Sequence, residues 1–173
     1  MLAPGDLIFH PRHGFGTISG MTRRDPIRPI QDVVASDGVT DLAQDYYDIQ
    51  LTNGGTLLVP VNRAKRVGLR RLTNGLDAIT LCLQLPAQSL SGDARERAAE
   101  LWARGQVGEP TALAASVRDM VAQSRGRAHT ASEREWLNKS CERLSTEAAL
   151  VDGISKSEAH AAIWEAVKQL SAT

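Results

Sequence analysis

Short β-type runs, each broken by glycine, proline or asparagine, fill the stretch from Gly5 to Arg71 and constrain the fold more than any other feature. Runs of this length with turn residues between them are typical of small all-β structures. Gly14 and Gly16 flank Phe15, which predicts a turn or bulge with a positive φ or a close backbone approach, and Phe15 in the core. We therefore expect a small β-barrel or a strongly bent sheet here.

Local signals place some of the strands. Asn53-Gly54 lies between two apolar runs and predicts a β-hairpin. In the first run the residues alternate, so that every second side chain from Tyr47 onward would share one face. The second run, Leu57 to Val61, is almost continuously apolar, which predicts a strand buried on both faces. Residues 25–45 fit neither period, and we expect a mobile loop there with a short helical turn around Thr40–Gln44.

From residue 73 onward the sequence is rich in alanine and changes to helix-type patterns. Two capping boxes, a proline suited to a first turn and a terminating glycine mark helix ends, namely Thr130/Glu133, Ser155/Glu158, Pro110 and Gly153. We expect Thr73 or Asn74 to cap the first helix and Ser91 to cap the second. The sequence therefore predicts an α+β chain, with a β domain over residues 1–72 and an all-α helical domain over residues 73–173.

The charges of the chain cancel, which argues against a strongly basic nucleic-acid-binding domain. Lysine and arginine total 20, as do aspartate and glutamate, in 173 residues. Residues 1–72 carry nine basic and seven acidic side chains, a balance of +2, and residues 73–173 carry eleven and thirteen, a balance of −2. Five basic residues crowd together and form either a solvated turn or a patch for nucleic acid or an acidic protein: Arg63, Lys65, Arg66, Arg70 and Arg71.

Signals for catalysis, metal binding and membrane insertion are missing from the sequence. There is no Gly-x-Ser-x-Gly run, no phosphate-binding glycine loop and no apolar run of the roughly 20 residues that a membrane span needs, and we expect no secretory leader. No cysteine or acidic cluster accompanies His10 and His13, so we expect one of them to hydrogen-bond within the turn. Cys82 and Cys141 are expected to be buried small hydrophobes. We therefore expect a cytoplasmic, non-enzymatic protein with no cofactor, metal, membrane or small-molecule substrate.

Several short motifs of the N-terminal stretch follow one another in a specific order: Gly5-Asp6, His10-Pro11, His13-Gly14-Phe15-Gly16-Thr17-Ile18, Tyr46-Tyr47, Val59-Pro60 and Val67-Gly68-Leu69-Arg70. In this order and spacing the sequence resembles the CarD/CdnL family of transcription regulators, whose N-terminal module is shared with the transcription-repair coupling factor. The resemblance covers the N-terminal stretch closely and rests beyond it on a helical tail of the right length. It implies a Tudor/SH3-like β-barrel that interacts with RNA polymerase.

The resemblance further implies that this barrel docks on the β subunit of RNA polymerase. A barrel with an exposed edge can add a partner strand, using backbone hydrogen bonds for affinity. The residues that match the family's contact region are Met21, Thr22, Arg23, Arg24, Leu57 and Leu58. Family members often have a basic residue where this chain has Leu58. We therefore expect Arg23 and Arg24 to make the main polar contacts.

The resemblance also implies promoter contact by the helical domain, where a family Trp wedges into the minor groove beside basic residues. The matching segment, Ser89 to Arg97, contains no Trp. Leu90 is the candidate for a smaller wedge, and Arg95 and Arg97 are the candidates for phosphate contact.

The three tryptophans lie outside that segment. Trp102, Trp136 and Trp164 fall in apolar stripes and are expected in the core. With no Trp wedge and a helical domain of balance −2, we expect weak, salt-sensitive binding of DNA by the chain alone, and promoter contact only when polymerase holds it.

The function that these expectations favour is a bacterial transcription regulator that docks on polymerase and stabilises the open complex. Two alternatives stay open. One is a polymerase-docking protein that does not engage DNA, and the other is an adaptor whose barrel binds a different protein.

Overall fold

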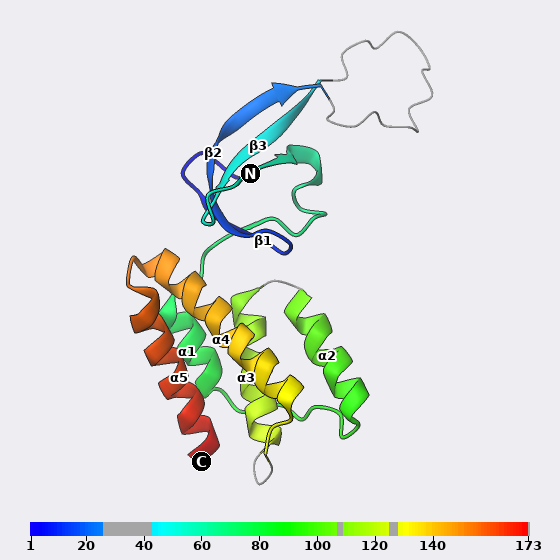
Figure 1. Ribbon diagram of the computed structural model, residues 1–173, viewed down its shortest axis with the longest axis vertical. Coiled ribbons are helices and arrows are strands. Elements are labelled where there is room, and N and C mark those ends of the chain that lie inside the picture. Colours follow the sequence, from blue (N-terminus) through cyan, green and yellow to red (C-terminus); the bar gives the residue numbers. More distant parts are fainter. Residues whose placement is uncertain (26–42, 107–108, 125–127, 173) are drawn as a thin grey trace. The chain divides into compact units, whose positions relative to one another are not determined.

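The computed structural model describes residues 1–25, 43–106, 109–124 and 128–172 (Figure 1). Nearly all of the loop expected over residues 25–45 lies outside these ranges. The chain divides into two units, Met1–Arg71 and Leu72–Thr173. The first unit contains the strands and the second contains the α-helices, so the predicted α+β class is confirmed.

The strands of the first unit form one antiparallel sheet in the order β4-β3-β2-β1-β5. They span Leu7–His10 (β1), Gly14–Arg24 (β2), Gln44–Leu51 (β3), Thr56–Pro60 (β4) and Arg70–Arg71 (β5), with a 3-10 turn at Val61–Arg63. Within the described ranges no pairing joins β4 to β5. The sheet is therefore open, and the closed barrel is not the observed form.

The turn between β1 and β2 has the backbone features predicted from its glycines. Gly14 has a φ of 81°, in the left-handed region. At Gly16 an added Cβ atom would lie 2.7 Å from the backbone oxygen of Gln50, so a larger residue does not fit. Phe15 is buried between them, and its ring centroid lies 5.2 Å from that of Phe9. Both parts of the prediction, the backbone and the buried Phe15, are confirmed.

The hairpin between β3 and β4 also forms as predicted, with the backbone N–H of Leu51 donating to the oxygen of Gly55 at 2.8 Å. Tyr47, Ile49 and Leu51 lie together in the apolar core of the sheet. In β4, however, Val59 is the one buried residue. The expectation of a strand buried on both faces is wrong, because β4 is an outer strand.

The described part of the second unit forms five helices: α1 (Leu76–Gln84), α2 (Ala94–Gln106), α3 (Pro110–Gln123), α4 (Ala131–Asp152) and α5 (Lys156–Ala172). Four of them bury a shared core that includes Ile79, Val117, Leu144 and Ile163. Helix α2 lies at the side of this core and contributes Leu101 to it. Over the described ranges, no helix is both long and apolar enough to cross a membrane.

Signals that lie close together in sequence set several helix ends as predicted. The Thr130 hydroxyl accepts from the backbone N–H of Glu133, whose side chain caps in return, so the first capping box is present. The Ser155 hydroxyl accepts from the backbone N–H of Glu158 at 3.1 Å. Gly153 ends α4 with a φ of 67°.

Two other helix caps differ from the prediction. Neither Thr73 nor Asn74 caps α1, because the carboxylate of Asp152 takes that role. Ser91 does not cap α2, because the carboxylate of Asp93 accepts from the backbone N–H groups of the first turn at 2.9 and 3.0 Å. Both caps are carboxylates, which also suit the positive end of a helix dipole.

Candidate functional site

Strand β2 extends beyond the strand that pairs with it on one side. β1 pairs with β2 over Gly14 to Thr17. Two further backbone hydrogen bonds join Ile18 to Gly5 and Asp6. From Ser19 to Arg24, the strand that pairs with β2 in the described chain is β3, on the other side. This stretch therefore has an open edge, along which alternate backbone N–H and C=O groups point outward.

The residues predicted for docking divide between the two faces of the sheet. The strand register opposes Gly20 to Asp48 and Asp48 to Leu58, and side chains alternate along each strand. One face therefore carries Thr22, Arg24 and Leu58, and the opposite face carries Met21, Arg23 and Leu57. Met21 is 45% exposed, whereas Leu57 packs against the sheet core. Met21, Thr22, Arg23 and Arg24 lie on the strand with the open edge. Leu57 and Leu58 lie on β4, on the far side of β3, so the six residues do not form one patch.

Asp48 lies in the middle of the face that carries Thr22 and Leu58. Its carboxylate accepts from the Thr22 hydroxyl, and its backbone oxygen accepts from the Ser19 hydroxyl at 3.0 Å. The second carboxylate oxygen, Oδ1, is buried and has no hydrogen-bond partner in the described part of the chain. Sequence reasoning missed Asp48, because nothing local distinguishes it from the other aspartates of this region.

The five basic residues of the predicted cluster divide into two that make contacts within the sheet unit and three that lie exposed in a connection. The guanidinium of Arg71 lies 2.5 Å from the Asp6 carboxylate, and that of Arg70 lies 5.0 Å from the ring centroid of Phe9. These two contacts hold β5 to the start of the chain and to β1. Three exposed residues of the cluster lie in the connection between β4 and β5: Arg63, Lys65 and Arg66.

His10 has a structural role in the turn, as predicted. It is 6% exposed, and its Nδ1 accepts from the backbone N–H of Arg12 at 3.1 Å. Burial is the main cause that lowers its pKa, and the charges of His13 and Arg12 lower it further. No cluster of histidine, cysteine and acidic side chains that could hold a metal is found over the described ranges.

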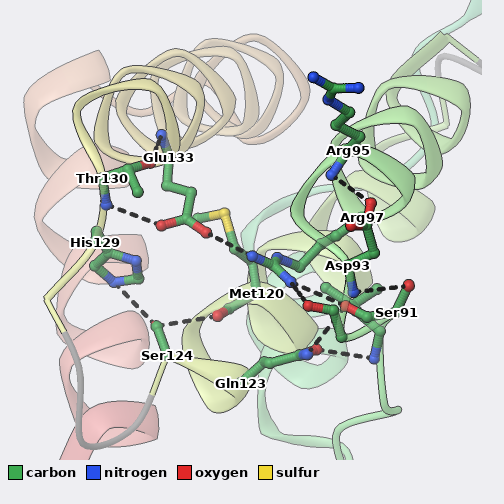
Figure 2. A network of polar contacts seen from close by, with 12 residues as sticks. Ser91, Asp93, Arg95, Arg97, Met120, Gln123, Ser124, His129, Thr130 and Glu133 are labelled. Atoms are coloured by element: carbon green, nitrogen blue, oxygen red, sulfur yellow. Dashed lines mark hydrogen bonds and ion pairs between the residues drawn. The ribbon is translucent and has the colours of Figure 1, made fainter.

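In the helical unit, Leu90 belongs to the apolar core and is 6% exposed. Its backbone N–H donates to the side-chain oxygen of Gln123 at 3.0 Å, and the Gln123 amide donates to the backbone oxygen of Ser91 at 3.3 Å (Figure 2). A wedge has to project into solvent. Leu90 points instead into its own domain, and the wedge assigned to it has no support in the structure.

The two arginines assigned to phosphate contact differ from each other. Arg97 donates to the backbone oxygens of Ser91 and Gly92 at 2.9 and 3.2 Å and lies 3.6 Å from the Glu133 carboxylate. The side chains of Arg97 and Glu133 are 12% and 13% exposed. Arg95 is exposed, and Figure 2 shows its guanidinium pointing away from this network. Of the three predicted DNA contacts, Arg95 alone is presented to solvent.

The prediction that Trp102 lies in the core is wrong, because its side chain is 65% exposed. The inward side of α2 carries Arg97, Leu101 and Arg104, at helical spacings of four and three. Trp102 follows Leu101 and is therefore turned about 100° away from that side. The other two tryptophans are partly buried and pack against the core, as expected: Trp136 and Trp164.

A buried carboxylate that sequence reasoning missed organises the same region. Asp119 is fully buried and accepts from Arg118 at 2.6 and 2.8 Å, from Arg104 at 2.8 Å and from the backbone N–H of Gln88 at 2.9 Å. Its partners come from α3, α2 and the α1–α2 connection. A single acidic residue therefore pairs with two arginines, one of which also pairs with Glu100, and fixes an irregular segment.

Comparison with protein-family models finds two matches. The model of the CarD-like/TRCF RID domain matches residues 2–73, and the model of the CarD C-terminal domain matches residues 78–164. The first match covers the sheet and the open edge of β2, and the second covers most of the helical unit. A comparison with curated proteins finds no match.

Proposed function

This chain belongs to the CarD-like family of transcription regulators, which interact with RNA polymerase, and on that premise we propose that it docks on the polymerase β subunit through β2. We assign it to bacteria and to the cytoplasm, as a non-enzymatic regulator that changes the lifetime of the open promoter complex. The observation that supports the docking site is the open edge of β2 from Ser19 to Arg24.

An open strand edge favours docking by strand addition. Backbone N–H and C=O groups along the edge supply affinity, and the side chains beside it supply specificity. A strand of the β subunit laid along Ser19 to Arg24 would extend the sheet past β2. It would then meet Thr22 and Arg24 on one face and Met21 and Arg23 on the other.

The polar groups near this edge indicate what the partner offers. Arg24 would be complementary to an acidic group on the β subunit. Leu58, where family members often carry a basic residue, lies two strands away on β4 and is not part of this edge.

Contact with promoter DNA is the secondary part of the proposal. Arg95 is exposed and can reach a phosphate, whereas Leu90 is buried in its own domain and Arg97 makes its contacts there. Arg95 is the one exposed cation among the three predicted contacts, and the unit has a charge balance of −2, so this segment gives little counterion release. DNA contact therefore requires polymerase to hold the helical unit at the promoter.

A second candidate function follows from the burial of Leu90. With no wedge at that position, the chain can occupy the polymerase site without propping open DNA, and so compete with a relative that does. A general adaptor that binds another protein is the third reading. Copurification with polymerase from cell extract separates the adaptor from both polymerase-binding alternatives.

Calorimetric titration of the full chain with the isolated β subunit tests the docking site. Arg24→Glu and Arg23→Glu are measured separately, because the two side chains lie on opposite faces. The variant whose guanidinium is desolvated in the complex loses about 2 kcal/mol or more of binding free energy, and one at the rim loses less than about 1 kcal/mol.

Arg66→Glu is the matched control, since it makes the same charge change at an exposed position outside the edge. Unchanged binding in both edge variants, or an equal loss in Arg66→Glu, contradicts the assignment. The lifetime of the open complex with and without the chain then distinguishes a stabiliser from a competitor.

A further inference from the structure

A groove of about 840 Å³ runs between α4 and α5, at a distance in sequence from every residue discussed for docking or promoter contact. Helix α4 lines it with Asn138 and Glu142. Helix α5 lines it with Ser157 and with a row of four other side chains: Lys156, His160, Trp164 and Lys168. The two helices are neighbours in Figure 1, where α5 is red.

The row on α5 has a regular spacing. Its members lie four residues apart, which places them on one side of the helix with a rise of about 6 Å per step. The two lysines at the ends are therefore about 18 Å apart along the axis. Between two cations lies an aromatic surface, an arrangement that sequence analysis had not singled out.

Trp164 is held in a fixed orientation. Its Nε1–H donates to Nε2 of His160 at 2.8 Å, and part of its side chain packs against the helical core. The remaining part lines the groove. The ring is thus a rigid platform on which a second flat ring can stack.

The lysines at either end are held weakly. Lys156 lies 2.8 Å from Glu142, but both side chains are more than half exposed, and exposed ion pairs contribute little to stability. Lys168 lies 3.9 Å from Glu165 with similar exposure. Both ammonium groups can turn from their glutamates toward a phosphate, and the loss of these exposed ion pairs costs the protein little stability.

We propose that this groove binds single-stranded nucleic acid, with one base stacked on Trp164 and phosphates bound by Lys156 and Lys168. Aromatic platforms combined with cations along a groove are the general solution for binding single strands. Unpaired bases expose the faces that stack, whereas a duplex hides them. The site is separate from β-subunit docking and does not depend on it.

An acidic peptide would use the lysines but would leave the Trp164 platform without a flat partner. A nucleotide strand spreads its charge along the backbone and offers a base to the ring, and the Asn138 amide can hydrogen-bond a base edge. The observed side chains therefore favour the nucleic acid.

The test measures fluorescence anisotropy of a labelled oligothymidylate titrated with the full chain. Trp164→Leu keeps an apolar side chain against the core and is expected to weaken binding at least about fivefold, the lower end of what one base–aromatic stack contributes. Trp164→Phe keeps a ring and should retain most of the affinity. Trp102→Leu, at an exposed tryptophan outside the groove, should leave it unchanged.

Salt dependence reports the phosphate contacts. Two contacts predict a slope of log K against log salt of about −1.4, and Lys168→Gln should reduce its magnitude by about 0.7. Lys139→Gln is the matched control, because Lys139 also pairs with a glutamate on an exposed helix surface but lies outside the groove.

Three results overturn the proposal. They are equal affinity for the single strand and for its duplex, an effect of Trp102→Leu as large as that of Trp164→Leu, and tighter binding of polyglutamate than of the oligonucleotide. β-subunit binding by Trp164→Leu, measured in parallel, should stay normal, so failure here is distinct from failure of the docking proposal.

Discussion

The carboxylate of Asp152, the last residue of α4, accepts a hydrogen bond from the backbone N–H of Leu76, the first residue of α1, at 2.6 Å. The first N–H groups of any helix lack partners within that helix. In α1 the partner comes from a residue far away in sequence. The end of one helix therefore fixes the start of another.

Replacing Asp152 with alanine should destabilise the helical unit by about 1 kcal/mol, the usual effect of losing an N-terminal cap. Asp152→Asn keeps an acceptor oxygen and should lose less. Denaturant unfolding followed by circular dichroism measures both. An alanine variant as stable as the parent chain would show that water replaces the carboxylate at no penalty.

Gly75→Ala should destabilise the chain only while Asp152 is present. A Cβ atom at Gly75 would overlap the Asp152 carboxylate, so the side chain must leave its capping position. In the Asp152→Ala background that overlap is gone, and alanine at this φ of −82° should be neutral or slightly stabilising. A double-mutant cycle measures the coupling. Additive effects would contradict the predicted overlap.

Arg97→Ala and Arg95→Ala should act on different properties, although the two residues are close in sequence. Arg97→Ala removes two hydrogen bonds and an ion pair from a mostly buried position and should destabilise the helical unit by about 1–3 kcal/mol. Arg95→Ala should change stability by less than about 0.5 kcal/mol. In a transcription assay, Arg95→Ala should shorten the open-complex lifetime without weakening β-subunit binding. An unchanged lifetime favours the docking-only function.

Gly14→Val should destabilise the sheet by about 1–3 kcal/mol or more, because a β-branched residue fits poorly at a φ of 81°. Gly14 has open space around its missing Cβ, so the penalty comes from the backbone alone. Gly20→Val is the control, since the nearest atom to its added Cβ is 3.9 Å away and its φ is not positive. Thermal unfolding of both variants tests the difference, and equal losses would contradict it.

Acid should destabilise the first unit through His10. Burial lowers the pKa of His10 below its ordinary 6.5, so the unfolded chain binds this proton more readily than the folded chain. The contribution is fully favourable above pH 6.5 and is lost as the pH falls below that value toward the lowered pKa. His10→Asn keeps an acceptor for the Arg12 N–H and should flatten this part of the stability profile. Melts on either side of pH 6.5 measure it, and an unchanged profile would rule His10 out.

The features predicted correctly are those whose causes lie within a few residues. The turn glycines, the Asn53-Gly54 hairpin and the capping box at Thr130 each need only their immediate neighbours. The family motifs of the first stretch work in the same way, since each is a short local pattern. Local patterns therefore fixed the order of strands and helices.

The features predicted wrongly depend on partners that are distant in sequence. The cap of α1 is Asp152, and no sequence pattern near Leu76 predicts that contact. Trp102 was predicted to be in the core because it falls in an apolar stripe. The side of α2 that faces inward instead depends on the ion pair between Arg104 and Asp119 on α3. Leu90 was placed by correspondence with relatives, yet it fills the core of its own domain. For the site, the sequence predicted an exposed edge beside Arg23 and Arg24, and that edge is observed in β2. Docking on it stays a prediction, and Asp48 was missed.

The segment between α1 and α2 has neither helix nor strand, and yet two of its backbone N–H groups are held by side chains of α3. Gln88 donates to the buried Asp119 and Leu90 donates to Gln123. Amide hydrogens in an irregular segment ordinarily exchange with solvent quickly, because nothing but water binds them. Here the two amides can exchange only when the segment detaches from α3. In this protein two amides of a stretch without regular structure should therefore exchange about as slowly as those of the helix that holds them.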